Sequence, residues 1–114
     1  MVIRKEHIDI CRDTMEYIFY EIGTENINMD VRVFRDTVIS MVDIINDDKT
    51  RYSRIEIPDD IIKLTTPSLG MKSGIIDSFW RKVAKLLTKY AIKHGKYCGY
   101  MVENGVKYIE IEKL

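Results

Sequence analysis

Hydrophobic residues recur at steps of three and four along three stretches of the chain, which is the period of an amphipathic helix. The first stretch covers 4–22 and stops at Gly23, and the second covers 31–45, with Asp30 placed to cap its N-terminus. The stripe that we expect this second helix to bury is Val31, Phe34, Val38, Met41, Val42 and Ile45. The third stretch, 75–93, has the clearest pattern. Its apolar face consists of Ile76, Phe79, Trp80, Val83, Leu87 and Tyr90.

Alternating apolar and polar residues predict three strands, over 54–57, 97–102 and 106–112. Asn104 and Gly105 separate the last two strands, and this pair is a strong hairpin signal because both residues tolerate a positive φ. The turn also fixes the register of the hairpin. The cross-strand pairs are then Val102 with Lys107, Tyr100 with Ile109 and Cys98 with Ile111.

The segment between the first strand and the third helix is less regular. Pro58 and the acids after it predict a short helix over 59–64, because proline and carboxylates both suit a helix N-terminus. Residues 65–74 are rich in turn formers. The elements together predict a single α+β domain over 1–114, in which 1–23 is an additional N-terminal helix.

The charges divide the chain in two, although its formal net charge is zero. Residues 1–60 carry 8 Lys and Arg against 14 Asp and Glu, whereas residues 61–114 carry 10 against 4. Between Lys63 and Lys96 there are eight cationic side chains and one acid, Asp77. Such an asymmetry is typical of a surface that faces a polyanion.

From Asp30 onward the order of expected elements is helix, strand, short helix, turn, long helix and hairpin. This order resembles the winged helix-turn-helix superfamily of DNA-binding domains over residues 30–114. Residues 75–87, Ile-Ile-Asp-Ser-Phe-Trp-Arg-Lys-Val-Ala-Lys-Leu-Leu, look like a recognition helix, and the hairpin looks like the wing. The resemblance implies a sequence-specific regulator of transcription that binds double-stranded DNA, without enzymatic activity, through a helix within 73–93 in the major groove. We expect it to bind as a homodimer.

The resemblance also implies which side chains touch DNA. Arg81 is placed for a bidentate contact to guanine, and the lysines and serines for phosphate, while Asp77 is a further base-reading candidate. Asn104 and Lys107 would lie nearest the DNA backbone or the minor groove. The full set of expected DNA contacts is Lys72, Ser73, Ser78, Arg81, Lys82, Lys85, Lys89, Asn104 and Lys107.

Two features depart from the superfamily. About ten residues separate the short helix from the long one, where a helix-turn-helix unit has a turn of about 3–4 residues. The wing is also short and carries Glu103 at its tip, so only a phosphate contact from Lys107 is expected of it.

Other interpretations of the basic helix stay open. It could be a solvated face, a surface for an acidic partner protein, or a contact with the acidic half of a neighbouring subunit in a homodimer. The helix over 4–22 could pack on its own core or form a dimer interface. A small metal-dependent nuclease is a distant third class, suggested by Pro58-Asp59 and by the acids in 110–113.

Composition adds little chemistry. Cys11 and Cys98 fit no metal spacing and are expected to be small buried hydrophobes. No pattern indicates a cofactor, a metal or a small-molecule ligand. No apolar run reaches the roughly 18 residues of a membrane span, and no signal core follows Arg4 and Lys5, so we expect a cytoplasmic, intracellular protein. The absence of glutamine and the 18 isoleucines favour a thermophilic source.

Overall fold

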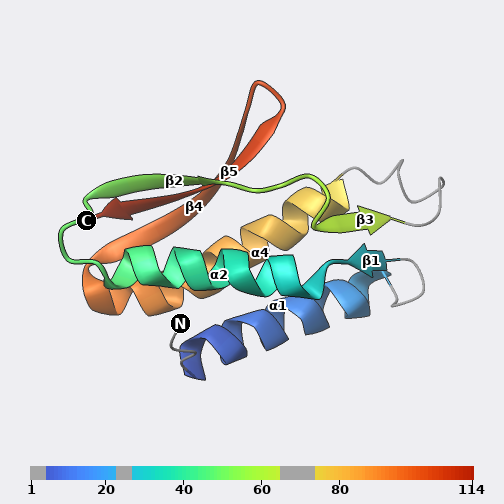
Figure 1. Ribbon diagram of the computed structural model, residues 1–114, viewed down its shortest axis with the longest axis horizontal. Helices are drawn as coiled ribbons and strands as arrows, with labels where there is room; N and C mark the ends of the chain where they lie inside the picture. The colour runs from blue at the N-terminus through green and yellow to red at the C-terminus, as the bar shows by residue number, and fades with distance from the viewer. Residues whose placement is uncertain (1–4, 23–26, 65–73) are drawn as a thin grey trace.

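Three long helices lie on one side of a three-stranded antiparallel sheet in the computed structural model, which describes residues 5–22, 27–64 and 74–114 (Figure 1). The helices are α1 (Lys5–Ile22), α2 (Val31–Asn46) and α4 (Gly74–Ala91), and a short 3₁₀ turn, η2 (Ile92–His94), extends α4. The sheet has the order β2 (Tyr52–Glu56), β5 (Val106–Lys113), β4 (Lys96–Glu103). A second, two-stranded sheet pairs β1 (Ile27–Met29) with β3 (Ile62–Leu64).

The helices follow the predicted periodicity closely. Asp30 caps α2, because its carboxylate accepts a hydrogen bond of 3.0 Å from the backbone N–H of Val33. The predicted stripe of α2 is buried from Phe34 to Ile45, and Ile39 is buried with it. Val31 was wrongly included in that stripe. It is 49 % exposed at the first position of the helix, one residue after the Asp30 cap.

The predicted hairpin is confirmed in its register. Val102 pairs with Lys107, and the pairs Tyr100–Ile109 and Cys98–Ile111 follow along β4 and β5. Asn104 and Gly105 have φ values of 53° and 80°, the left-handed conformation that a two-residue turn of this kind requires. The strand predicted over 54–57 corresponds to β2, which pairs antiparallel with the other edge of β5.

The short helix predicted over 59–64 is wrong. Ile62–Leu64 is a strand that pairs antiparallel with Ile27–Met29, and the backbone N–H of Asp30 donates to the Ile61 carbonyl at 2.9 Å. Ile61 and Ile62 are both buried, and β-branched residues favour a strand once a partner strand is present. The α+β layout is still compatible with a winged-helix-like arrangement.

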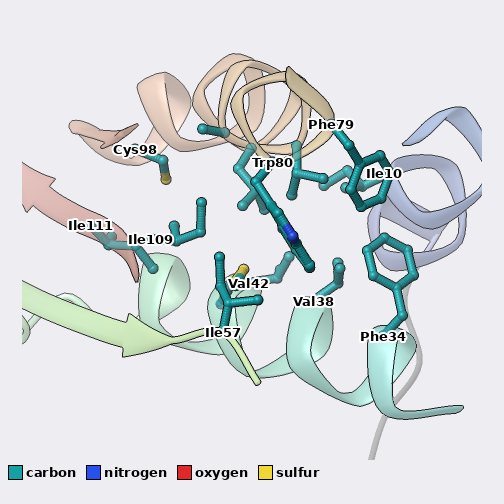
Figure 2. Close-up of a cluster of buried hydrophobic side chains, with 14 of the residues drawn as sticks. Ile10, Phe34, Val38, Val42, Ile57, Phe79, Trp80, Cys98, Ile109 and Ile111 are labelled. Atoms are coloured by element: carbon teal, nitrogen blue, oxygen red, sulfur yellow. The ribbon is translucent and has the colours of Figure 1, made fainter. Parts of the chain in front are cut away.

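One core joins the helices to the inner face of the sheet. Phe34 of α2 lies between two aromatic residues of α4, with ring centroids 5.7 Å from Phe79 and 5.9 Å from Trp80. Figure 2 shows Trp80 reaching toward α2 beside Val38 and Val42. The prediction that Trp80 is a core residue is confirmed, since it is 2 % exposed.

Lys96 is buried, at 2 % exposure, and it connects the start of the hairpin to the end of α2. Its Nζ donates to the carbonyl oxygens of Ile44, Ile45 and Asp47, at 2.9, 3.1 and 2.5 Å. These carbonyls stand at the C-terminus of α2, where the helix dipole attracts a cation and no intrahelical partner remains. Lys96, the first residue of β4, therefore supplies hydrogen-bond donors to the carbonyl groups at the end of α2.

Both cysteines are free, and each is at least half buried. Burial raises the pKa of Cys11 to about 11 and that of Cys98 to about 12. These thiols are therefore protonated at neutral pH, and the expectation of two small hydrophobes is confirmed.

We expect Lys96→Met to destabilise the fold by about 1–3 kcal/mol, because methionine matches the volume but leaves the α2 carbonyls without their donor. Urea unfolding measures this loss. Lys93→Met, at an exposed lysine three positions earlier, is the matched control and should change the midpoint little. Equal stability of the two variants would refute the bridging role of Lys96.

Candidate nucleic-acid interface

The exposed side of α4 carries four cations and one serine, which we call the basic face: Ser78, Arg81, Lys82, Lys85 and Lys89. Four of these side chains are exposed and Lys82 is half-buried. They come together because the opposite side of the helix is apolar and buried from Phe79 to Leu87. From Arg81 to Lys89 the row extends about 12 Å, at about 1.5 Å per residue.

Asp77, the one acid in α4, is engaged by the hairpin. The Tyr100 hydroxyl donates to its Oδ1 at 2.5 Å, and the Arg81 guanidinium lies 5.8 Å from the centre of the Tyr100 ring. Burial raises the pKa of Tyr100, and the hydrogen bond to Asp77 raises it further. Tyr100 therefore remains a hydrogen-bond donor at neutral pH, and it holds Asp77 and Arg81 near β4.

A groove of about 490 Å³ runs between α4 and β4. Its floor is mostly apolar and includes Ala84, Ile92 and Cys98, while Arg81, Lys85 and Lys89 stand along its length. The groove lies at an edge of the sheet, because β4 is an outer strand in the order β2-β5-β4 that the described residues form. The basic face thus borders an apolar channel, which the sequence alone did not indicate.

Thr88 joins α4 to the edge of β4. Its Oγ1 accepts from the backbone N–H of Cys98 at 3.1 Å and lies 2.9 Å from the Cys98 carbonyl, to which it can donate. The Ala84 carbonyl, at 2.8 Å, is the alternative acceptor for the same proton. The Thr88 hydroxyl therefore takes the place of a strand partner for the Cys98 backbone groups at the edge of the sheet.

On its other side, the basic face borders α1. A second groove, of about 210 Å³, is lined by Asp9 and Asp13 of α1 and by Lys89 and Lys93. Within α4 and η2 these lysines have almost no acids within a turn, as the sequence indicates, but the fold brings α1 acids beside them. Acids therefore lie near both ends of the row, Asp77 beside Arg81 and the α1 carboxylates beside Lys89.

The expected wing residues lie away from this face. Asn104 is exposed in the hairpin turn, and Lys107 is half-buried, with its carbonyl accepting from the Ile57 N–H at 2.9 Å. Glu103 at the tip is paired with Arg54, at 3.1 Å. Neither Asn104 nor Lys107 lines the groove beside α4. Lys72 and Ser73 lie outside the described residues.

Within 5–22, 27–64 and 74–114, no three His, Cys, Asp or Glu side chains are grouped so that they could hold a metal ion. In the same part of the chain, no helix has the length and apolar character needed to cross a membrane. Comparisons with protein-family models, with curated proteins and with solved structures give no match to this chain.

We expect Thr88→Val to speed hydrogen exchange at the Cys98 amide and to cost about 1–2 kcal/mol of stability, because that amide loses its acceptor. Native-state exchange followed by NMR measures both effects. Thr37→Val is the control, since the Thr37 hydroxyl bonds only within its own helix, to the Val33 carbonyl. An unchanged Cys98 amide would show that Thr88 does not hold the edge.

Proposed function

We propose that this protein binds double-stranded DNA through the basic face of α4 and regulates transcription. The observation that carries the proposal is the row of exposed cations on one side of a regular, well-packed helix. Asp77, the one acid of α4, accepts a hydrogen bond from the Tyr100 hydroxyl of the hairpin. Like charges at this density repel one another, and a polyanion relieves that repulsion.

The dimensions of α4 suit a major groove. The groove of B-DNA is about 12 Å wide, which admits one α-helix. In such a groove Arg81 can face base edges while the lysines farther along α4 face phosphates. Arg81 has the planar fork that reads guanine, and the lysines act as point charges for phosphate.

The order of elements agrees with a winged-helix-like protein. A helix, α2, precedes the first strand of the sheet, and α4 leads directly into the hairpin. Two features differ from the helix-turn-helix pattern: β3 stands where a short helix was predicted, and the hairpin tip lies away from the basic face. We therefore assign the main contact to α4, and to the hairpin at most a phosphate contact through Lys107.

We expect the affinity for a random-sequence duplex to fall steeply with salt. If the five cations from Arg81 to Lys93 each neutralise one phosphate, the slope of log affinity against log salt is about −4 to −5, at about 0.9 counterion per contact. Fluorescence anisotropy with duplex and single-strand probes measures this slope. Absence of duplex binding even at low salt would contradict the proposal.

We expect Arg81→Ala to relax sequence preference and Lys89→Ala to weaken binding to all duplexes alike, because only a bidentate side chain reads a base. Binding to a randomised library, followed by sequencing, separates the two effects. Arg81→Lys is a further variant that keeps the positive charge but loses the planar guanidinium, so it tests the bidentate contact separately from the charge. Lys49→Ala, at an exposed lysine before β2, is the control. Identical profiles for the Arg81 and Lys89 variants would refute this division of roles.

A second function is favoured by the groove beside α4, namely docking of an acidic partner protein. An apolar floor with Arg81, Lys85 and Lys89 along it suits a segment that combines carboxylates with apolar side chains. Ile92→Ser separates the two functions, because Ile92 is 58 % exposed in the groove and carries no charge. Partner docking would weaken in this variant and would persist at salt that abolishes phosphate contacts, whereas DNA binding would be unchanged.

A further inference from the structure

The outer face of the three-stranded sheet is not covered by α1, α2 or α4, which all lie on the opposite side (Figure 1). Strand alternation places on this face the residues paired across β2, β5 and β4 at every second position. We call this surface the outer sheet face: Tyr52, Arg54, Glu56, Tyr97, Gly99, Met101, Glu103, Val106, Tyr108, Glu110 and Glu112. It combines four carboxylates and three aromatic rings with one cation, Arg54, which pairs with Glu103 at 3.1 Å.

Two carboxylates in the middle of this face are held in position. The Tyr52 hydroxyl donates to Glu110 Oε2 at 2.6 Å, and the Tyr97 hydroxyl donates to Glu112 Oε2 at 3.0 Å. These hydrogen bonds raise the pKa of both tyrosines, so the hydroxyls remain donors at neutral pH. The face thus presents ordered negative charge on rigid strands.

Gly99 leaves an open position beside one of these carboxylates. It pairs with Glu110 on the neighbouring strand, and a Cβ atom placed on it would meet nothing within 4 Å. Its neighbours on the same side of β4 are Tyr97 and Met101, two positions away in each direction. A cationic side chain that enters here would meet a carboxylate together with an aromatic ring, and both attract a cation.

The spacing of charges on α4 matches that of the sheet. Lys85 and Lys89 are four residues apart on a helix, a rise of about 6 Å. Glu110 and Glu112 are two residues apart on a strand, a distance of about 7 Å. A helix laid along β5 would therefore bring two cations over two carboxylates at once.

We propose that the outer sheet face docks the basic face of α4 from a second copy of this chain, with Lys85 and Lys89 over Glu110 and Glu112. The occupant is identified by charge complementarity, because the basic face carries four cations and the outer sheet face four carboxylates, while the chain as a whole has zero net charge. A protein without net charge has no overall repulsion to keep its copies apart. The contact joins two different surfaces, so it forms either a reciprocal dimer or a head-to-tail chain.

This inference goes beyond DNA binding and stands without it. If both hold, the two uses of α4 exclude each other, because DNA and the second copy occupy the same basic face. Self-association would then keep α4 covered until DNA displaces the second copy.

Sedimentation velocity at low ionic strength and at about 1 M salt tests the proposal, since the Debye length falls to about 3 Å at the higher salt. We expect the wild-type protein to associate at low salt and to sediment as a monomer at high salt. Two double variants test the contact. One carries Lys85→Glu with Lys89→Glu, and the other carries Glu110→Lys with Glu112→Lys. Each should associate about tenfold more weakly than the wild type, or not at all. An equimolar mixture of the two should associate again, because every contact between them is complementary.

Matched controls separate this contact from a change of net charge. One control variant carries Arg32→Glu with Lys49→Glu, and the other carries Asp43→Lys with Asp48→Lys. They change the net charge by the same amounts as the two test variants, at exposed sites outside both surfaces. We expect these variants to associate more strongly than the two test variants. Gly99→Leu keeps every charge but fills the open position, and it should weaken association without loss of fold.

A wild-type protein that is monomeric at low salt would overturn the proposal, and so would a mixture of the two test variants that fails to associate. Duplex binding by Glu110→Lys, Glu112→Lys distinguishes failure of this proposal from failure of DNA binding, because that variant keeps the whole of α4. If it binds a duplex while the wild type is monomeric, only the self-association is refuted.

Discussion

The packing of Phe34 against Phe79 and Trp80 determines which side of α4 is buried and which side faces solvent. The Phe34 ring of α2 packs 5.7 Å from Phe79 and 5.9 Å from Trp80 of α4, so it holds the apolar side of α4 toward α2. Aromatic pairs at this separation contribute about 0.5–1.5 kcal/mol beyond the area they bury. Because the apolar side of α4 is fixed inward, its cations face outward. The basic face is therefore a consequence of the core.

A second constraint joins the helices to the hairpin and sets where β4 lies. Lys96 reaches the carbonyls at the end of α2, Thr88 bonds the backbone of Cys98, and Asp77 accepts from Tyr100. The three contacts hold β4 at successive positions along its length. They place the groove directly beside the cations of α4, and they turn the outer sheet face away from the helices. The basic face thus follows from the helical spacing of side chains on α4, and the outer sheet face follows from the alternation of side chains along the strands.

Local signals explain most of what the sequence could predict. Asp30 caps α2 and Asn104-Gly105 sets the hairpin register, and both act over a few residues, so pattern alone was sufficient. The pairing of β1 with β3 was missed, because three-residue strands give a weak signal and their partners lie about 35 positions apart in sequence. The proline and acids before Ile61 favoured a helix there, and burial against the core favoured a strand instead.

The candidate site was predictable only in part for the same reason. Helical spacing alone predicted that the cations lie opposite the apolar side of the helix, and Ser78 was added only by the winged-helix resemblance. In the structure Ser78, Arg81, Lys85, Lys89 and Lys93 are exposed and Lys82 is half-buried. The burial of Lys96 had no sequence signal, since lysine is almost never buried without specific partners. The contact of Tyr100 with Asp77 and the α1 acids beside Lys89 depend on tertiary packing, which spacing within one element cannot reveal.

The most direct test of the account compares two variants with the same change of net charge. In fluorescence anisotropy with a random-sequence duplex at low salt, Lys85→Glu, Lys89→Glu should lose about tenfold or more in affinity. Arg32→Glu, Lys49→Glu, which leaves the basic face intact, should bind nearly as the wild type does. Equal losses in the two variants would mean that net charge, and not the arrangement on α4, governs binding, and would contradict the account.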